Sequence, residues 1–365
     1  MKLVLLGDGD SPHLLKWALA LAPRVELYAA SSRGFLPGFD AAVPPARRLA
    51  LNTSPHFEGG NVALLRSLPR LAAWLGAVQP DWLHAHYLTS HGTLGWLARS
   101  LWRLPAGIVG SAWGSDILVT PERSASMRWL TRRVLRACAL TTSDSQHMAQ
   151  RMRELGAGEV MTFPFGLEKL PSLADRSDPA QDLRFFANRG LEPIYAPQRV
   201  LAAFCAIARD WPAAELVVAN DGSLLPTLRA QAAATGLSAR VRFVGRLGAD
   251  ALAQHYRRAR WYISLPTSDS VSVSVLEALG HGCIPILSDL AANRELVRNG
   301  DNGLILADGA WPNAALLAPL AERAEKIAQA NRAWVAEHAM FEPAVERFVA
   351  RLSELNGQRQ RRARA

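Results

Sequence analysis

Two carboxylates, Asp269 and Glu277, stand eight positions apart in the segment PTSDSVSVSVLEALGHGCIP. Serine and valine alternate between them, and we expect a helix to begin near Leu276 and to end before the strand-like IPILS. Carboxylates accept hydrogen bonds from sugar hydroxyls, and the unpaired amides at a helix N-terminus bind a diphosphate. With Glu277 expected in the first turn of this helix, the segment offers both groups together. This combination indicates a nucleotide-sugar site.

Such residues need a scaffold, and strand and helix signals alternate over almost the whole chain. We expect strands in KLVLLG, RVELYAAS, PDWLHAHY, GIVGSAW, DLRFFANRG, AELVVAND, RVRFVG and RWYISLPTS. Strands that alternate with helices form parallel sheets covered on both faces, and ligands bind at the carboxyl ends of such strands. The sequence therefore predicts an α/β protein with two doubly wound, Rossmann-like parallel sheets facing across a cleft.

The length of 365 residues exceeds one ordinary core, so two domains are expected. The break falls in TFPFGLEKLPSLADRSDPAQ, which is rich in proline, serine and aspartate. We predict an N-terminal domain over 1–168, a linker over 169–180 and a C-terminal domain over 181–340. We also expect a C-terminal helix over about 341–358 to pack back on the N-terminal domain.

Composition narrows the class and the compartment. No apolar run approaches the ~18–20 residues that span a bilayer, and MKLVLLGDGD is a short strand rather than a signal peptide. The three cysteines, Cys138, Cys205 and Cys283, are far apart and odd in number. They indicate a reduced, cytoplasmic protein without a metal cluster.

The net charge of +9 comes almost wholly from arginine, because only four lysines occur. Either GC-rich codon usage or attraction to an anionic surface explains this bias. The segment SMRWLTRRVLRACAL favours the second explanation locally, because four arginines recur at near-helical spacing among apolar residues: Arg128, Arg132, Arg133 and Arg136. Such a basic amphipathic helix can lie on an anionic membrane. The arginine-rich tail GQRQRRARA is expected to be disordered, and no nucleic-acid-binding signature appears.

Several segments, taken in order, resemble the family 4 retaining glycosyltransferases, which have the GT-B fold. They are GDGDSPHLLKWALAL, HAHY, SAWGSDI, PFGL, the stretch ELVVANDGSLLPTLRAQAAATGLSARVRFVGRL and SDSVSVSVLEAL. The resemblance implies a metal-independent enzyme without a cofactor. It also implies a UDP- or GDP-type sugar donor and a glycan or lipid-linked acceptor in cell-surface polysaccharide or lipopolysaccharide synthesis. Together with the basic helix, it places the protein peripherally at the inner face of the cytoplasmic membrane.

The resemblance implies a donor site in the C-terminal domain. Glu277 would grip the ribose hydroxyls, Asp269 would contact the sugar where the family usually has glutamate, and Arg189 would hold the diphosphate. The full set of implied donor-binding residues is Gly9, Arg189, Arg246, Leu247, Asp269, Ser270, Val271, Ser272, Val273 and Glu277. The family follows its arginine with a lysine-glycine pair, but Leu191–Ala196 contains no lysine. Arg199 or a backbone contact would have to substitute.

On the acceptor side the implied residues are His86, Trp113 and Asp116, and the implied catalytic set is Asp269, Arg189 and Asp116. Many members of the family have histidine where Trp113 stands, so a histidine role there cannot be carried over. Trp113 would stack on a sugar or lie buried as an ordinary aromatic, and His84 and His86 share one strand face without a third metal ligand. His13 would cap the first helix or face the cleft.

Three other functions remain open at this point. A GT-B sugar-nucleotide 2-epimerase shares the fold and the donor but needs no acceptor. A non-catalytic, membrane-associated nucleotide-sugar-binding protein would explain the missing lysine and the aspartate at position 269. A phosphorylase that uses pyridoxal phosphate would need Lys326 or Lys169 for its Schiff base.

Overall fold

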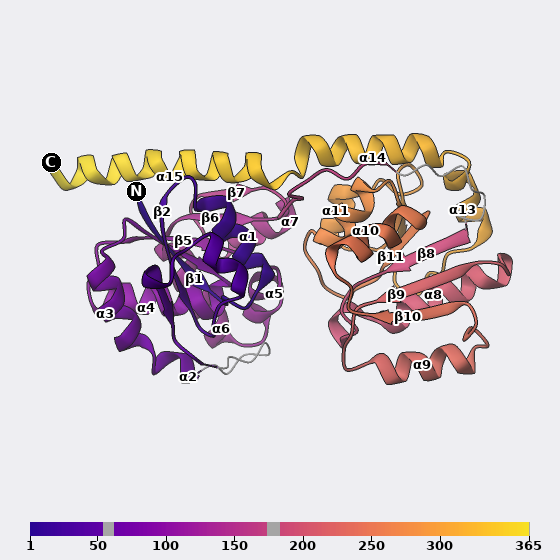
Figure 1. Ribbon diagram of the computed structural model, residues 1–365, viewed down its shortest axis with the longest axis horizontal. Helices are drawn as coiled ribbons and strands as arrows, with labels where there is room; N and C mark the ends of the chain where they lie inside the picture. The colour runs from indigo at the N-terminus through magenta and orange to yellow at the C-terminus, as the bar shows by residue number, and fades with distance from the viewer. Residues whose placement is uncertain (54–61, 174–182, 365) are drawn as a thin grey trace. The chain divides into compact units, whose positions relative to one another are not determined.

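A computed structural model describes residues 1–53, 62–173 and 183–364 of the chain. The chain forms two compact units, one of Met1–Phe163 with Glu342–Ala365 and one of Pro164–Phe341 (Figure 1). Residues 164–168, which we placed in the N-terminal domain, therefore belong to the second unit. Most of the linker that we expected, residues 174–180, lies outside the described residues.

The first unit contains a seven-stranded, wholly parallel sheet in the order β3-β2-β1-β4-β5-β6-β7. Its strands are β1 (Lys2–Gly7), β2 (Glu26–Ser31), β3 (Arg48–Ala50), β4 (Trp82–His86), β5 (Gly107–Ser111), β6 (Cys138–Ser143) and β7 (Val160–Thr162). The order reverses between β1 and β4, which defines the switch point of this sheet. The apolar run KLVLLG forms a strand because the sheet buries it on both faces.

Helices cover both faces of this sheet. They are α1 (Pro12–Leu21), α2 (Val62–Leu65), α3 (Leu68–Val78), α4 (Thr93–Leu101), α5 (Ser115–Leu118), α6 (Ala125–Ala137), α7 (Gln146–Glu154) and α15 (Phe341–Arg364). The described residues of this unit also form three short 3-10 turns, η1 (Pro37–Ala41), η2 (Pro45–Arg47) and η4 (Thr120–Glu122), and one π-helical turn, η3 (Leu88–Gly92). Side-chain oxygens of Ser11, Ser124 and Ser145 accept from main-chain amides and start α1, α6 and α7. Ser11 rather than His13 therefore caps the first helix, which excludes one of the two alternatives given for His13.

The C-terminal segment of the first unit also differs from what we expected. The tail that we expected to be disordered continues α15 to Arg364. Arg359 anchors it, because Nη1 donates to the carbonyl of Asp81 at 2.8 Å, Nη2 donates to the carbonyl of Pro105, and the guanidinium lies 4.8 Å from the Trp82 ring centroid. Earlier in the helix, Phe348 packs 5.2 Å from Trp17. Packing of an amphipathic face thus orders a segment whose composition alone suggested disorder.

The second unit contains a six-stranded parallel sheet in the order β10-β9-β8-β11-β12-β13, with its switch point between β8 and β11. The strands are β8 (Arg184–Ala187), β9 (Glu215–Ala219), β10 (Val241–Gly245), β11 (Trp261–Ser264), β12 (Ile284–Ser288) and β13 (Leu304–Leu306). The helical segments are η6 (Pro193–Tyr195), α8 (Pro197–Asp210), α9 (Leu225–Ala234), α10 (Ala249–Arg258), α11 (Val273–Gly280), α12 (Ala291–Leu296), α13 (Ala314–Ala321) and α14 (Ala324–His338).

Two hydrophobic cores lie on opposite faces of this second sheet. On one face Phe185 stacks on Trp261 at 5.8 Å, beneath α8 and α9. On the other face Phe186 and Tyr262 pack among residues of α10, α11 and α14. Each such side chain, once buried, contributes roughly 1.5–3 kcal/mol. The prediction of two doubly wound parallel sheets is confirmed.

Candidate active site

In the second unit the candidate residues gather at the switch point of the sheet. β8 and β11 are neighbours there, and the loops that follow them carry Arg189 and Asp269. Chains leaving neighbouring strands at a switch point diverge to opposite faces, and the gap between them is where α/β sheets bind ligands. The sequence placed both residues at the ends of expected strands, and the sheet order brings them together.

Arg189 and Asp269 hold each other. Nη2 of Arg189 donates to Oδ2 of Asp269 at 2.6 Å, and Nη1 donates to the hydroxyl of Ser272 at 2.5 Å. The guanidinium also lies 4.4 Å from the ring centroid of Tyr195. The sequence assigned Arg189 and Asp269 to the ligand separately, and did not predict that they pair with each other.

Burial acts against both charges of this pair. Burial raises the pKa of Asp269, while the Arg189 charge and the amide of Ser270 act in the opposite direction. Burial by itself would lower the pKa of Arg189, but the Asp269 carboxylate and three nearby tyrosines together outweigh burial and raise this pKa. Because each charge compensates the other, loss of either partner would leave a mostly buried ion without a counter-charge.

Glu277 corrects an expectation about the helix. α11 begins at Val273, so Glu277 lies in its second turn, not its first, and the prediction that it starts the helix is wrong. The helix dipole acts mainly on the terminal turn, so it does not account for this carboxylate. Instead, Oε2 of Glu277 accepts from the hydroxyl of Tyr256 at 2.9 Å.

The segment between the two carboxylates is a loop that turns into a helix. Ser270, Val271 and Ser272 are buried, and the amide of Ser270 donates to Oδ1 of Asp269 at 3.0 Å. Ser272 occupies the N-cap position of α11, but its hydroxyl accepts from Arg189 and makes no capping bond to the helix. The N-terminal amides around Val273 therefore have no side-chain cap, which is the arrangement that suits an anion.

The segment in which the family has lysine is used differently in this chain. Both carboxylate oxygens of Glu192 accept from Ser223, from the amide at 2.9 Å and from the hydroxyl at 2.5 Å. Arg199, the substitute considered from the sequence, donates to Asp308 at 2.9 Å. This segment thus fastens the β8–α8 loop to the β9–α9 loop and adds a negative charge.

The residues expected beside the nucleobase follow β10. Gly245 ends this strand with φ of +71°, a left-handed conformation that glycine adopts readily, and its carbonyl accepts from the amide of Asn220 at 2.6 Å. Arg246 is exposed and Leu247 is half-buried in the following loop.

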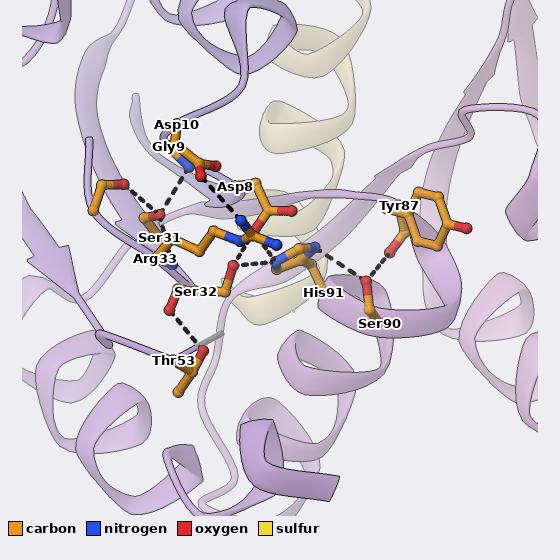
Figure 2. Close-up of polar contacts among 11 residues, drawn as sticks. Asp8, Gly9, Asp10, Ser31, Ser32, Arg33, Thr53, Tyr87, Ser90 and His91 are labelled. Atoms are coloured by element: carbon orange, nitrogen blue, oxygen red, sulfur yellow. Dashed lines mark hydrogen bonds and ion pairs between the residues drawn. The ribbon is translucent and has the colours of Figure 1, made fainter. Parts of the chain in front are cut away.

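The first unit carries a polar cluster at its own switch point, where β1, β2 and β4 end (Figure 2). Asp8 accepts from the hydroxyl of Ser32, and the same hydroxyl lies 3.0 Å from Nε2 of His91. Arg33 lies beside them and donates to Asp10 at 3.3 Å. Burial by itself would raise the pKa of Asp8, but the hydrogen bond and charge of His91, together with Ser32 and Arg33, lower it. Sequence reasoning did not single out Asp8, Ser32 or His91, although Asp8 and Ser32 each follow an expected strand.

Two residues predicted at this edge have structural contacts instead. Asp116 is fully buried, its oxygens accept from the amides of Leu88 at 2.8 Å and Trp113 at 2.9 Å, and burial raises its pKa to about 6. It joins two loops of the first unit and is not exposed to an acceptor. A Cβ on Gly9 would lie 2.5 Å from the carbonyl of Gly34, so this glycine permits a close loop contact rather than an open approach to a ligand.

His86 and Trp113 do lie together. Their ring centroids are 5.7 Å apart, and His13 lies 4.9 Å from Trp113. His86 is only 3% exposed, and neither ring nitrogen has a hydrogen-bond partner among the described residues. Burial, then the charges of His84 and His91, lower the pKa of His86 well below 6.5, so its ring is neutral.

The basic helix predicted from the sequence ends earlier than expected. α6 stops at Ala137, and Cys138 begins β6, because the following Leu140–Thr142 pair with β5. The four arginines of α6 are exposed, Trp129 is 54% exposed among them, and the guanidinium of Arg133 lies 5.4 Å from its ring centroid. Thr131, Val134 and Leu135 face the core.

The described residues contain neither a candidate metal site nor a candidate membrane-spanning helix. In residues 1–53, 62–173 and 183–364 no group of three or more His, Cys, Asp or Glu side chains could hold a metal ion. Over the same ranges, no helix combines the length and the apolar character needed to cross a membrane.

Comparison with known proteins decides the family. Residues 11–166 match the glycosyl transferase 4-like domain and residues 180–334 match glycosyl transferases group 1. The chain belongs to the group 1 glycosyl transferases. A D-inositol 3-phosphate glycosyltransferase of Geodermatophilus obscurus is 28% identical over 69% of this chain and 62% of its own length. The same enzyme of Rhodococcus opacus is 30% identical over 69% of this chain and 64% of its own length. The matches thus span less than two thirds of these two relatives.

Two solved structures share the fold of this chain. Anabaena Alr3699/HepE in complex with UDP and glucose superposes with a TM-score of 0.77 at 16% identity, covering 97% of this chain and 99% of that one. Sucrose-phosphate synthase from Thermosynechococcus elongatus gives 0.77 at 14% identity, with full coverage of both chains. The GT-B prediction is confirmed.

Proposed function

We propose that this protein is a retaining glycosyltransferase that moves a sugar from a nucleotide-sugar donor to a hydroxyl of a glycan or lipid-linked acceptor. The observation that carries this proposal is the grouping of Arg189, Asp269 and Ser272, with an N-terminus of α11 that no side chain caps, at the switch point of the second sheet. The UDP-glucose complex of the structurally similar HepE supports a UDP-type donor. We assign the acceptor to cell-surface polysaccharide or lipopolysaccharide synthesis.

In the proposed donor complex Glu277 binds the ribose hydroxyls, and the amides at the N-terminus of α11 bind the diphosphate. Asp269 contacts the sugar while Arg189 holds that carboxylate and adds positive charge near the diphosphate. The loop around Arg246 and Leu247 lies against the base. Loss of the family lysine leaves the helix amides and Arg189 as the main groups that bind the phosphates.

The reaction then needs no protein nucleophile. The bond from the anomeric carbon to the diphosphate breaks, the acceptor oxygen bonds to the same face of that carbon, and the acceptor proton passes to an oxygen of the leaving diphosphate. Positive charge and oriented amides stabilise the developing negative charge on this leaving group. Asp116, given its burial, supports the acceptor side only by positioning the loops that carry Leu88 and Trp113.

We propose that the acceptor is an uncharged sugar, which binds to the first unit. The two relatives described above are named for D-inositol 3-phosphate, which carries a phosphate. Here the switch point has an ionised Asp8, and Arg33 beside it donates to Asp10. A carboxylate attracts hydroxyl donors and repels phosphate, while the half-buried ring of Trp113, which lies against the buried His86, supplies an aromatic surface. Asp8→Asn should therefore reduce transfer to an uncharged acceptor and leave UDP binding unchanged.

The exposed face of α6 is proposed to dock on anionic lipid. Arginines near a membrane surface contribute about 1 kcal/mol each, so Arg132→Ala with Arg133→Ala should weaken binding to phosphatidylglycerol vesicles about thirty-fold. The matched control is Arg257→Ala with Arg258→Ala, an exposed arginine pair on α10 of the other unit. Equal vesicle binding by both double variants would refute the proposed surface.

The donor assignment is tested by thermal unfolding with UDP-, GDP- and ADP-sugars. A sugar nucleotide at a hundred times its Kd should stabilise the protein by about 2.7 kcal/mol. Glu277→Ala should abolish most of this stabilisation, whereas Glu322→Ala, which removes an exposed glutamate of the same unit, should retain it. Stabilisation that survives Glu277→Ala unchanged would contradict the ribose role.

One second function has an observation in its favour. Both terminal nitrogens of Arg189 are engaged by Asp269 and Ser272, which also suits a non-catalytic nucleotide-sugar-binding protein. Such a protein would bind the donor without releasing a nucleoside diphosphate in the presence of acceptor glycans. A sugar-nucleotide 2-epimerase is tested separately. It would convert the donor without any acceptor, so mass spectrometry of the donor incubated alone with the protein separates epimerisation from transfer.

A further inference from the structure

A chain of buried hydrogen bonds leads to Glu277. The hydroxyl of Tyr262 donates to Oδ1 of Asn188 at 2.8 Å, and Nδ2 of Asn188 donates to the hydroxyl of Tyr256 at 2.8 Å. The hydroxyl of Tyr256 in turn donates to Oε2 of Glu277 at 2.9 Å. These residues come from β11, the end of β8, α10 and α11, so four elements of the second unit meet at this carboxylate.

The chain has one direction. Because the amide nitrogen of Asn188 can only donate, the oxygen of Tyr256 must accept from it, and the single proton of Tyr256 is left to point toward α11. There it is shared between Glu277 and the carbonyl of Ser274 at 3.2 Å. Aligned hydrogen bonds in a buried setting polarise one another and hold the last acceptor firmly.

The tyrosine cannot move easily or lose its proton. Tyr256 is 1% exposed, its ring stacks on His281 at 5.3 Å and meets Phe186 edge-on at 5.0 Å. Burial, followed by Tyr262 and Glu277, raises the pKa of Tyr256 well above 10. The hydroxyl of Tyr256 therefore keeps its proton at neutral pH and remains a hydrogen-bond donor.

We propose that Tyr256 and Asn188 are positioning residues that orient Glu277 and thereby let the site distinguish a ribose from a deoxyribose nucleotide. This inference rests on the proposed function, because it assumes that Glu277 binds the ribose. The three-bond chain fixes Oε2 from behind, so the carboxylate presents one orientation to the sugar hydroxyls. Sequence patterns show Tyr256 and Tyr262 only as core aromatics, since nothing in YRRARWYIS marks them as partners of a distant glutamate.

The experiment compares UDP with 2′-deoxy-UDP by calorimetry, with GDP and 2′-deoxy-GDP measured in parallel. The wild-type protein should bind the ribonucleotide at least ten-fold more tightly. Tyr256→Phe should reduce this preference about five-fold while changing the affinity for the deoxynucleotide less than two-fold. Tyr262→Phe, at the far end of the chain, should show a smaller reduction. Tyr28→Phe, which removes a hydroxyl bound to Glu26 in the first unit, is the matched control and should change neither affinity.

The outcomes separate the inference from the proposed function. Equal weakening of both nucleotides in Tyr256→Phe, with the preference unchanged, would show a structural role only and would overturn the inference. If Tyr256→Phe does not fold, an unchanged preference in Tyr262→Phe overturns it as well. By contrast, wild-type protein that binds none of the four nucleotides would overturn the proposed function itself.

Discussion

Arg359 offers a direct test of how the C-terminal helix is held. Its guanidinium donates to the carbonyls of Asp81 and Pro105 and packs over the fully buried ring of Trp82. Hydrogen bonds from a charged group contribute about 1.5–3 kcal/mol each when buried, and a cation–π contact contributes about 0.5–2 kcal/mol. Two effects reduce the total stabilisation by these contacts. Burial disfavours the charge of Arg359 and lowers its pKa. In addition, the carbonyl of Asp81 still accepts from the amide of Gly107 when Arg359 is removed, so it is not left without a partner.

We therefore expect Arg359→Ala to destabilise the first unit by about 2–3 kcal/mol. For a unit of this size that corresponds to a fall in Tm of about 4–12 °C. Differential scanning calorimetry resolves the two units if they unfold separately, and hydrogen exchange of α15 amides reports the helix directly.

Arg362→Ala is the matched control, because Arg362 is an exposed arginine near Arg359 in the same helix, α15. It should change Tm by less than about 1 °C, since surface substitutions usually cost under 0.5 kcal/mol. Equal effects of the two substitutions, or no loss of protection in α15 for Arg359→Ala, would refute the docking role.

Three further predictions concern the site and the first sheet. Asp269→Asn should lower kcat about 10²–10³-fold, as loss of a charged group at the reacting centre does, and Arg189→Lys should lower it less; equal activity would exclude both from catalysis. Burial raises the pKa of Asp116 to about 6, so the folded protein holds this proton more tightly than the unfolded chain, and stability should fall by about 2–3 kcal/mol as pH rises from 4 to 6 and then level off. Urea titrations should show that the free energy of unfolding of the wild type falls between pH 4 and 6, whereas that of Asp116→Asn does not. Parallel dependence of the two free energies on pH would contradict the assignment. Gly107→Ala should destabilise the first unit, because its Cβ would lie 2.3 Å from the buried Trp82 ring and 2.5 Å from Arg359; an unchanged Tm would show that both side chains relax freely.

The sequence alone supported the architecture because hydrophobic periodicity is local. The run KLVLLG and its counterparts are short and apolar, and they alternate with helical segments, which is sufficient to predict parallel sheets covered by helices. The assignment of Arg189, Asp269 and Glu277 to the donor site came instead from the resemblance to the family 4 glycosyltransferases. Periodicity failed at element ends, where Glu277 lies one turn further into α11 than expected and α6 stops at Ala137.

What the sequence could not determine depends on partners that are distant along the chain. Arg189 and Asp269 are 80 residues apart, and only the order of β8 and β11 in the sheet makes them an ion pair. Tyr256 and Asn188 are 68 residues apart, and their hydrogen bond gives Glu277 the support that its place in the helix does not. Likewise, an arginine-rich tail suggests disorder until a tertiary surface provides the carbonyls and the Trp82 ring that hold Arg359. Local residue patterns specify which elements form, whereas the contacts of buried polar groups depend on which elements the fold makes neighbours.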